Sequence, residues 1–106
     1  MDTEKLIDNL AVNVKGNKNN RDILVFTLST CQWCKKCKAW LNERDVTYRY
    51  IDIDTIQPTL KSQLIDYILK KFGDVRISYP FMICDDDVVI GYNPGKYEEL
   101  MKDGGK

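Results

Sequence analysis

The sequence predicts one α/β domain whose strands and helices follow the order βαβαββα, preceded by a short N-terminal extension. A nearly continuous apolar run at residues 23–28 is typical of a central parallel strand covered on both faces. A helical pattern follows this run directly, as expected for a β-α-β unit. The length of 106 residues is common for a domain with one core. We therefore expect a four-stranded mixed sheet flanked by helices.

The N-terminal extension is expected to cover residues 1–21 and the domain residues 22–106. Residues 4–12 are predicted to form a short amphipathic helix. Residues 13–21 are rich in Asn, Lys and Gly and are predicted to form a loop. The extension is thus expected to contribute no strand.

The first helix of the domain is predicted to follow Ser29 and Thr30, which end the apolar strand, and to run to about Arg44. Its apolar residues recur at helical spacing and would form one buried stripe. These residues are Cys34, Cys37, Trp40 and Leu41.

A second strand is predicted over Val46–Asp54, where Ile51 and Ile53 share one face at a period of two. Pro58 then opens a longer helix, and Gly73 is placed to cap its C-terminal end. Because crossovers of this kind are right-handed, the first two strands are expected to lie parallel.

Two short strands at residues 81–84 and 88–90 surround an acidic turn and predict a β-hairpin. Asn93 and Pro94 fit the N-cap and the first position of a last helix. Two aromatic residues at the spacing of a hydrophobic staple support this helix start: Tyr92 and Tyr97.

The composition excludes several classes of function. The chain has no histidine, which removes hydrolases built on a Cys–His or Ser–His pair. Basic and acidic residues number 16 each, so no polyanion-binding surface and no nucleic-acid partner are expected. No run approaches the length of a membrane span, and no signal peptide is evident. We therefore expect a cytoplasmic monomer that does not contact membranes.

Three cysteines stand at the predicted strand–helix junction, in the segment CQWCKKC at residues 31–37. Cys31 would lie at the N-cap, where unpaired N–H groups and the helix dipole favour a thiolate. Nearby positive charge would add to this effect, from Lys35, Lys36 and Lys38. Cys34 would face inward and be more sheltered. This asymmetry indicates a two-cysteine cycle in which Cys31 attacks a substrate disulfide and Cys34 resolves the mixed disulfide.

The remaining cysteines and Trp33 each allow two interpretations. Cys37 could be a third redox cysteine that exchanges with Cys34, or a small apolar side chain in the core. Cys84 lies in a predicted strand among apolar residues, which favours a structural role. Trp33 could shape a substrate surface or serve packing.

The residues of four segments together resemble the glutaredoxin family, and most closely its NrdH-type redoxins. The segments are Ile23–Cys34, Tyr48–Asp54, Ser78-Tyr79-Pro80 and Gly91. The resemblance implies a thioredoxin-like fold with a cis peptide bond before Pro80, facing the active site. It also implies that the backbone of Tyr79 pairs with the substrate chain. The expected substrate-binding residues are Gln32, Trp33, Tyr79, Pro80 and Gly91.

Several positions depart from the family pattern. The usual Pro-Tyr between the cysteines is Gln32-Trp33. The lysine that helps to hold the glutathione carboxylate is replaced by Leu28. The Gly-Gly pair after the hairpin is Gly91-Tyr92, and Asn93-Pro94 follows in place of a polar pair that binds glutathione. These departures weaken the case for glutathione, which stays a possible reductant.

The function predicted from these observations is that of a dithiol thiol–disulfide oxidoreductase, without a bound cofactor or metal. Its partners would be a protein or small molecule with a disulfide, and a reductase or low-molecular-weight thiol as electron donor. The alternative is a module that binds zinc or an iron–sulfur cluster through cysteines. A third hypothesis, a redox-inactive adaptor, gives no reason for both Cys31 and Cys34.

Overall fold

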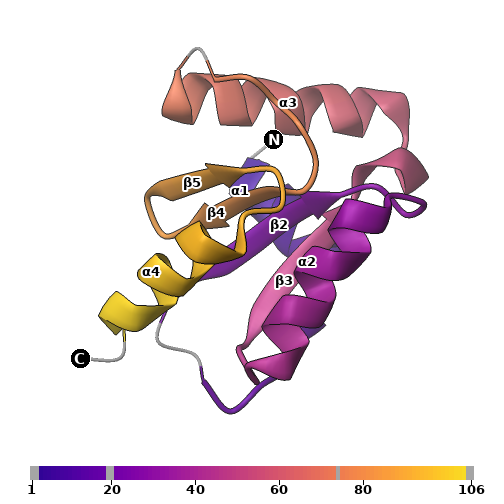
Figure 1. Ribbon diagram of the computed structural model, residues 1–106. Coiled ribbons are helices and arrows are strands. Elements are labelled where there is room, and N and C mark those ends of the chain that lie inside the picture. The colour runs from indigo at the N-terminus through magenta and orange to yellow at the C-terminus, as the bar shows by residue number, and fades with distance from the viewer. Residues whose placement is uncertain (1–2, 19–20, 74, 105–106) are drawn as a thin grey trace.

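The computed structural model describes residues 3–18, 21–73 and 75–104, and its elements surround a five-stranded mixed sheet (Figure 1). The strands lie in the order β1-β3-β2-β4-β5. The elements are α1 (Thr3–Leu10), β1 (Val12–Val14), β2 (Ile23–Thr27), α2 (Gln32–Glu43), β3 (Tyr48–Asp52), η1 (Ile53–Thr55), α3 (Pro58–Phe72), β4 (Phe81–Cys84), β5 (Asp87–Ile90) and α4 (Pro94–Gly104).

The central strand β2 runs parallel to β3 and antiparallel to β4, and β5 pairs antiparallel with β4. All five residues of β2 are buried, as its apolar run predicts for a strand covered on both faces. In the register, Phe26 lies beside Ile51 of β3 and Phe81 of β4. The carboxyl end of β2, where the cysteine segment begins, is therefore flanked by both neighbouring strands.

The sheet has one strand more than the four predicted, because the N-terminal extension supplies β1. Val12 pairs with Tyr50 and Val14 with Tyr48 along the outer edge of β3. The predicted helix over residues 4–12 ends at Leu10, and the predicted loop over residues 13–21 is wrong at its start. A strand of three residues with little burial carries almost no periodic signal, and the edge of β3 supplies its hydrogen bonds.

Helices cover both faces of the sheet in two layers (Figure 1). On one face, Ile23 and Val25 of β2 share a core with residues of α2 and α4, among them Leu41 and Tyr97. On the other face lies a second core with residues of β2, α1 and α3: Leu24, Phe26, Leu6, Ile7, Leu64 and Ile68. The alternation along β2 therefore divides the interior into two cores.

The helix ends predicted from caps are confirmed. Gly73 adopts a φ of 82° at the C-cap of α3, where its N–H donates to the carbonyl of Leu69 at 2.9 Å. Asn93 Oδ1 accepts a hydrogen bond from the N–H of Lys96 at 3.2 Å and so caps α4.

The strand predicted over residues 46–54 is shorter, because residues 53–55 turn into the 3₁₀ helix η1. None of the described helices is long and apolar enough to cross a membrane.

Replacing Ile7 by Ala should test whether α1 is an integral part of the fold. Ile7 belongs to α1, is 3% exposed and lies in the core that α1 shares with α3 and the sheet. The truncation should lower the free energy of unfolding by about 2–4 kcal/mol, since it leaves a cavity. Urea unfolding measures this change.

The matched control is Leu69→Ala on α3, where the leucine is 38% exposed. This variant should lose less than about 1 kcal/mol, since exposed positions contribute little and Ala favours helix. Equal losses in the two variants would contradict the packing of α1 against the domain.

Candidate active site

Cys31 occupies the N-cap of α2 at the end of the central strand. Its backbone is extended, with φ −82° and ψ 121°. Its N–H donates to the carbonyl of Leu28 at 3.2 Å, and its carbonyl accepts the first helical bond from Lys35 at 3.1 Å. Its Sγ accepts a hydrogen bond from the N–H of Cys34 at 3.2 Å. The sulfur thus takes the place of the usual capping oxygen, as the sequence predicts.

Cys34 lies one turn further along α2 and is fully buried, whereas Cys31 is partly exposed. Its Sγ accepts a weak hydrogen bond from the N–H of Leu28 at 3.5 Å. Burial raises the pKa of the Cys34 thiol well above its ordinary value, and the neighbouring Cys31 sulfur raises that pKa further. The two cysteines therefore differ in access, with Cys31 on the outside.

An aspartate from η1 holds the turn between β2 and α2. Asp54 accepts hydrogen bonds from the N–H of Ser29 at 2.9 Å and from its hydroxyl at 2.6 Å. These bonds lower the pKa of the Asp54 carboxyl. This contact is not among the features predicted from the sequence. A signal for it exists, because Ser29 and Asp54 both follow the carboxyl ends of parallel neighbours, which meet at one edge of the sheet.

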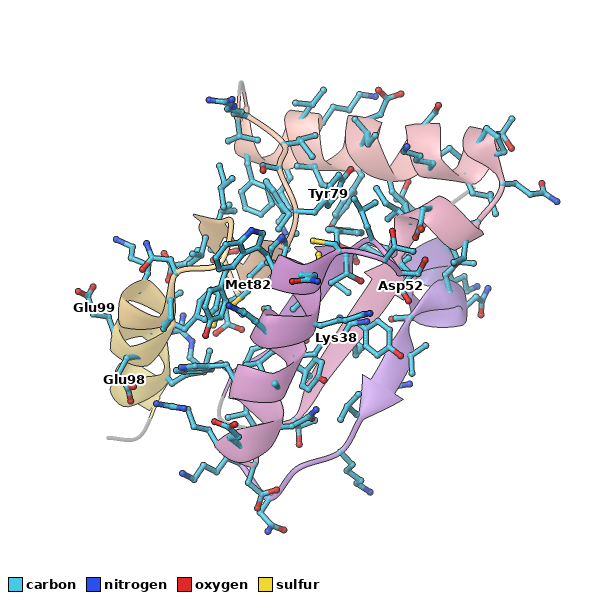
Figure 2. The ribbon with its side chains drawn as sticks, turned by 45° about the vertical axis from the view of Figure 1, so that its right-hand side comes forward. Lys38, Asp52, Tyr79, Met82, Glu98 and Glu99 are labelled. Carbon is cyan, nitrogen blue, oxygen red and sulfur yellow. The ribbon has the colours of Figure 1, made fainter. Side chains whose placement is uncertain are left out.

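Lys38 does not direct its charge toward Cys31, in contrast to what the sequence predicts. Its ammonium forms an ion pair with Asp52 at 3.2 Å and lies 3.8 Å from the centre of the Tyr50 ring. Figure 2 shows Lys38 and Asp52 turned toward each other between α2 and β3. The other two lysines of the first turns of this helix, Lys35 and Lys36, are exposed.

Tyr79 and Pro80 directly precede β4 and are here called the Pro80 loop. They lie near the carboxyl end of β2, because Phe81 of β4 pairs with Phe26. The peptide bond between Tyr79 and Pro80 is cis, as the family resemblance implies, and Pro80 is buried. The N–H of Gly91 donates to the carbonyl of Pro80 at 2.8 Å, which ties the loop to the end of β5. Figure 2 places Tyr79 between α3 and the amino end of α2. Burial raises the pKa of Tyr79, and the charge of Cys34 raises it further.

The two residues between the cysteines point outward. Gln32 is exposed, and the Trp33 side chain is 55% exposed, as its position in the motif predicts. The indole lies against the ring of Tyr92, with centroids 5.8 Å apart and planes inclined by 30°. The ammonium of Lys36 lies 4.6 Å from the indole centre. The contact with Tyr92 is not predicted from the sequence, since only the relative placement of α2 and α4 creates it.

Cys37 and Cys84 are both fully buried in the core that α2 and α4 cover. Burial raises the pKa of each thiol to about 11. This placement agrees with the interpretation of both residues as core packing, and a redox role for Cys37 stays a prediction.

The described residues contain no group of three or more Cys, Asp or Glu side chains arranged to hold a metal ion. The four described cysteines are free thiols. Of the four, only Cys31 reaches the surface. The arrangement therefore offers one accessible thiol with a second, buried thiol behind it.

A sequence model of the glutaredoxin family matches residues 23–77, just over half of the chain. The chain belongs to the glutaredoxin family. A glutaredoxin-like protein NrdH from Lactococcus lactis is 26% identical over 78 residues, which are 74% of this chain and 97% of that relative. The matched family segment includes both Cys31 and Cys34.

Two solved structures are similar to this glutaredoxin. Methanoredoxin from Methanosarcina acetivorans is 29% identical with a TM-score of 0.70, over 81% of this chain and 88% of that one. The glutaredoxin from Methanosarcina mazei has a TM-score of 0.72 at 24% identity, over 86% of each chain. These structures confirm the thioredoxin-like fold, and family membership supports a thiol oxidoreductase in general.

Alkylation should distinguish the four cysteines of the reduced, folded protein. At about pH 8, iodoacetamide should modify Cys31 first, because its sulfur alone is partly exposed. A thiol with a pKa of about 11 is ionised to only about one part in a thousand at that pH, so Cys37 and Cys84 should stay protonated and unmodified. Peptide mapping by mass spectrometry identifies the modified residue.

In urea, all four thiols should react, which controls for the reagent. Modification of Cys37 or Cys84 in the folded protein as fast as Cys31 would contradict the placement described above.

Replacing Tyr97 by Phe should test the contact between α4 and the turn at Gly91. The Tyr97 hydroxyl donates to the carbonyl of Gly91 at 2.8 Å, and the ring is fully buried. Its loss should lower the free energy of unfolding by about 1–2 kcal/mol, because a sheltered carbonyl loses its partner. Tyr67→Phe removes an exposed hydroxyl and is the matched control, with an expected loss below about 0.5 kcal/mol. Equal effects in denaturant unfolding would speak against this contact.

Proposed function

We propose that this glutaredoxin is a dithiol thiol–disulfide oxidoreductase, with Cys31 as the attacking and Cys34 as the resolving cysteine. One observation carries the proposal: the partly exposed Cys31 sulfur accepts the N–H of Cys34, while the Cys34 sulfur is fully buried. The backbone N–H and the N-terminal end of α2 stabilise negative charge on the outer sulfur. The outer sulfur is therefore the nucleophile, and the inner one waits for the intermediate.

The reaction then has two exchange steps. The Cys31 thiolate attacks one sulfur of the substrate disulfide, forms a mixed disulfide and releases the other substrate sulfur as a thiolate, which takes up a proton. Cys34 loses its proton and attacks the Cys31 sulfur, which releases the second substrate thiol. The substrate gains two electrons, and the protein is left with a Cys31–Cys34 disulfide. A reductase or a low-molecular-weight thiol returns the two electrons.

The raised pKa of Cys34 fits its place as the second nucleophile. Burial is the larger cause of the increase, and the charge on Cys31 is a smaller one. Once Cys31 is part of a mixed disulfide, its sulfur is neutral and this smaller contribution disappears. The N–H of Leu28 remains to stabilise the Cys34 thiolate. Deprotonation of Cys34 thus becomes easier at the step that requires it.

The substrate chain is proposed to bind over the exposed part of the motif and the Pro80 loop. Gln32 and Trp33 directly follow Cys31 and are exposed, and the hydrogen bond between Gly91 and Pro80 ties the Pro80 loop to the end of β5. In this position the backbone of Tyr79 would pair with the substrate.

We place the reaction in the cytoplasm, where thiols are kept reduced.

A reductase or a small thiol other than glutathione is the better electron donor for this site. Leu28 stands where the family has a lysine for the glutathione carboxylate and packs against the core instead. The amide oxygen of Asn93 is occupied as the cap of α4. The site therefore offers fewer polar groups to glutathione than the family pattern does.

Single-turnover reduction of a peptide disulfide dimer, with no other thiol present, should separate the two roles. Reduced wild-type protein should release two peptide thiols, because the exchange goes to completion. Cys34→Ser should release one thiol and keep the other peptide attached to Cys31. Cys31→Ser should release none, since the remaining thiols are buried. A thiol-specific dye and intact mass spectrometry measure these products.

Cys37→Ser is the matched control, since it removes a buried thiol of the same helix, and it should behave as wild type. Release of peptide thiol by Cys31→Ser, or two thiols from Cys34→Ser, would overturn the proposed function.

A further inference from the structure

Two aromatic rings and two lysines lie close to the outer cysteine and form what is here called the Trp33 surface. Its residues are Trp33, Tyr92, Lys35 and Lys36. The indole is 55% exposed although tryptophan is seldom left in water. The indole contacts the ring of Tyr92, which lies just before α4, and the ammonium of Lys36, which belongs to α2 like Trp33 itself. Exposed aromatic residues of this kind are enriched in the energetic centres of protein interfaces.

The Trp33 surface is rigidly supported from below. The Tyr92 ring meets the ring of Tyr97 at 6.0 Å and 70°, and Tyr97 is fully buried. Tyr97 in turn packs edge-on against Trp40 at 5.4 Å. The aromatic contact thus continues from the surface into the core, so that binding costs little conformational entropy.

The position of the Trp33 surface is set relative to the reacting sulfur. Trp33 is two residues beyond Cys31 on the first turn of α2. Tyr92 follows Gly91 directly, and Gly91 is hydrogen-bonded to Pro80. The surface therefore spans from the outer thiol to the turn that holds the Pro80 loop, where residues flanking a substrate cysteine would lie.

The charge beside this surface is positive. Lys35 and Lys36 are exposed, and the structure shows no ion pair for either within its described residues. The first turn of α2 contains no acidic residue. Two acidic groups at the junction have other partners, Asp52 with Lys38 and Asp54 with Ser29. Two lysines that form no ion pair with any described residue thus border an exposed aromatic ring.

We propose that the Trp33 surface binds a protein substrate whose disulfide cysteine is flanked by an apolar side chain and acidic residues. The apolar side chain would cover the indole, and the acidic residues would pair with Lys35 and Lys36. A small neutral disulfide needs only the Cys31 sulfur and gains nothing from this surface. The inference rests on the proposed function and names the kind of substrate that the same site prefers.

The experiment compares two peptides, each with one cysteine that is joined by a disulfide bond to the same small neutral thiol. In one, Leu and Asp flank the cysteine; in the other, Ser and Lys stand in their places. Wild-type protein should reduce the first with a kcat/KM about tenfold higher, and added salt should shrink this preference because exposed charges are screened. Hydroxyethyl disulfide, which is neutral, serves as the reference for the thiol chemistry itself.

Two variants assign the preference to the surface. Lys36→Glu should reverse most of the preference, expressed as the ratio of the two peptides' kcat/KM, so that a change in thiol reactivity cancels. Trp33→Ala should reduce the preference through loss of the apolar contact. The matched control is Lys70→Glu, which makes the same charge change in the last turn of α3 and should keep the wild-type ratio.

Equal kcat/KM for the two peptides in wild-type protein would overturn this inference, and so would equal ratios in Lys36→Glu and Lys70→Glu. In both cases reduction of hydroxyethyl disulfide would continue, and the proposed function would stand. Failure to reduce any of the three disulfides would instead overturn the proposed function and this inference with it.

Discussion

The hydrogen bond from the N–H of Cys34 to the sulfur of Cys31 is the interaction on which the site depends. A helix that starts directly after a buried strand must satisfy its first N–H groups locally, because no water reaches them from the sheet side. Here a sulfur does so, and the same bond that begins α2 holds the outer thiol in place. The N–H that makes this bond belongs to Cys34, whose side chain is buried. Helix capping and the asymmetry of the two thiols are therefore one structural fact.

The pairing of three strands brings the rest of the site to that bond. β3 lies parallel to β2, so its carboxyl end delivers Asp54 to Ser29, the residue that turns the chain into the helix. β4 runs antiparallel, so the segment before it brings Pro80 to the same end. The hydrogen bond between Gly91 and Pro80 then attaches the start of α4 to this group. Segments far apart in the sequence thus meet because a mixed sheet places their ends at one edge.

The parts that local sequence could predict are those with local causes. The apolar run of β2, the caps at Gly73 and Asn93, and the cysteine spacing at the helix start each depend on a few adjacent residues. The parts that it could not predict depend on register between distant segments. Val12–Val14 becomes a strand only because β3 has an open edge, and Lys38 turns to Asp52 only because β3 lies beneath α2. The contact between Trp33 and Tyr92 requires the placement of α4 against α2 in addition.

The three cysteines of the motif show how spacing and environment differ as guides to chemistry. Cys31, Cys34 and Cys37 recur every three residues, so the pattern alone treats them as equivalent partners. On a helix, however, each step of three residues advances along the axis while staying near one face, and this face is the buried one. Access to solvent is lost after the first cysteine, and the pKa of both inner thiols rises with burial. Cys34 still adjoins the outer sulfur through the capping turn, whereas Cys37 lies a further turn into the core. Exposure along the motif thus decreases with depth, and only the first pair combines an accessible sulfur with a second, buried thiol bonded to it through the capping turn.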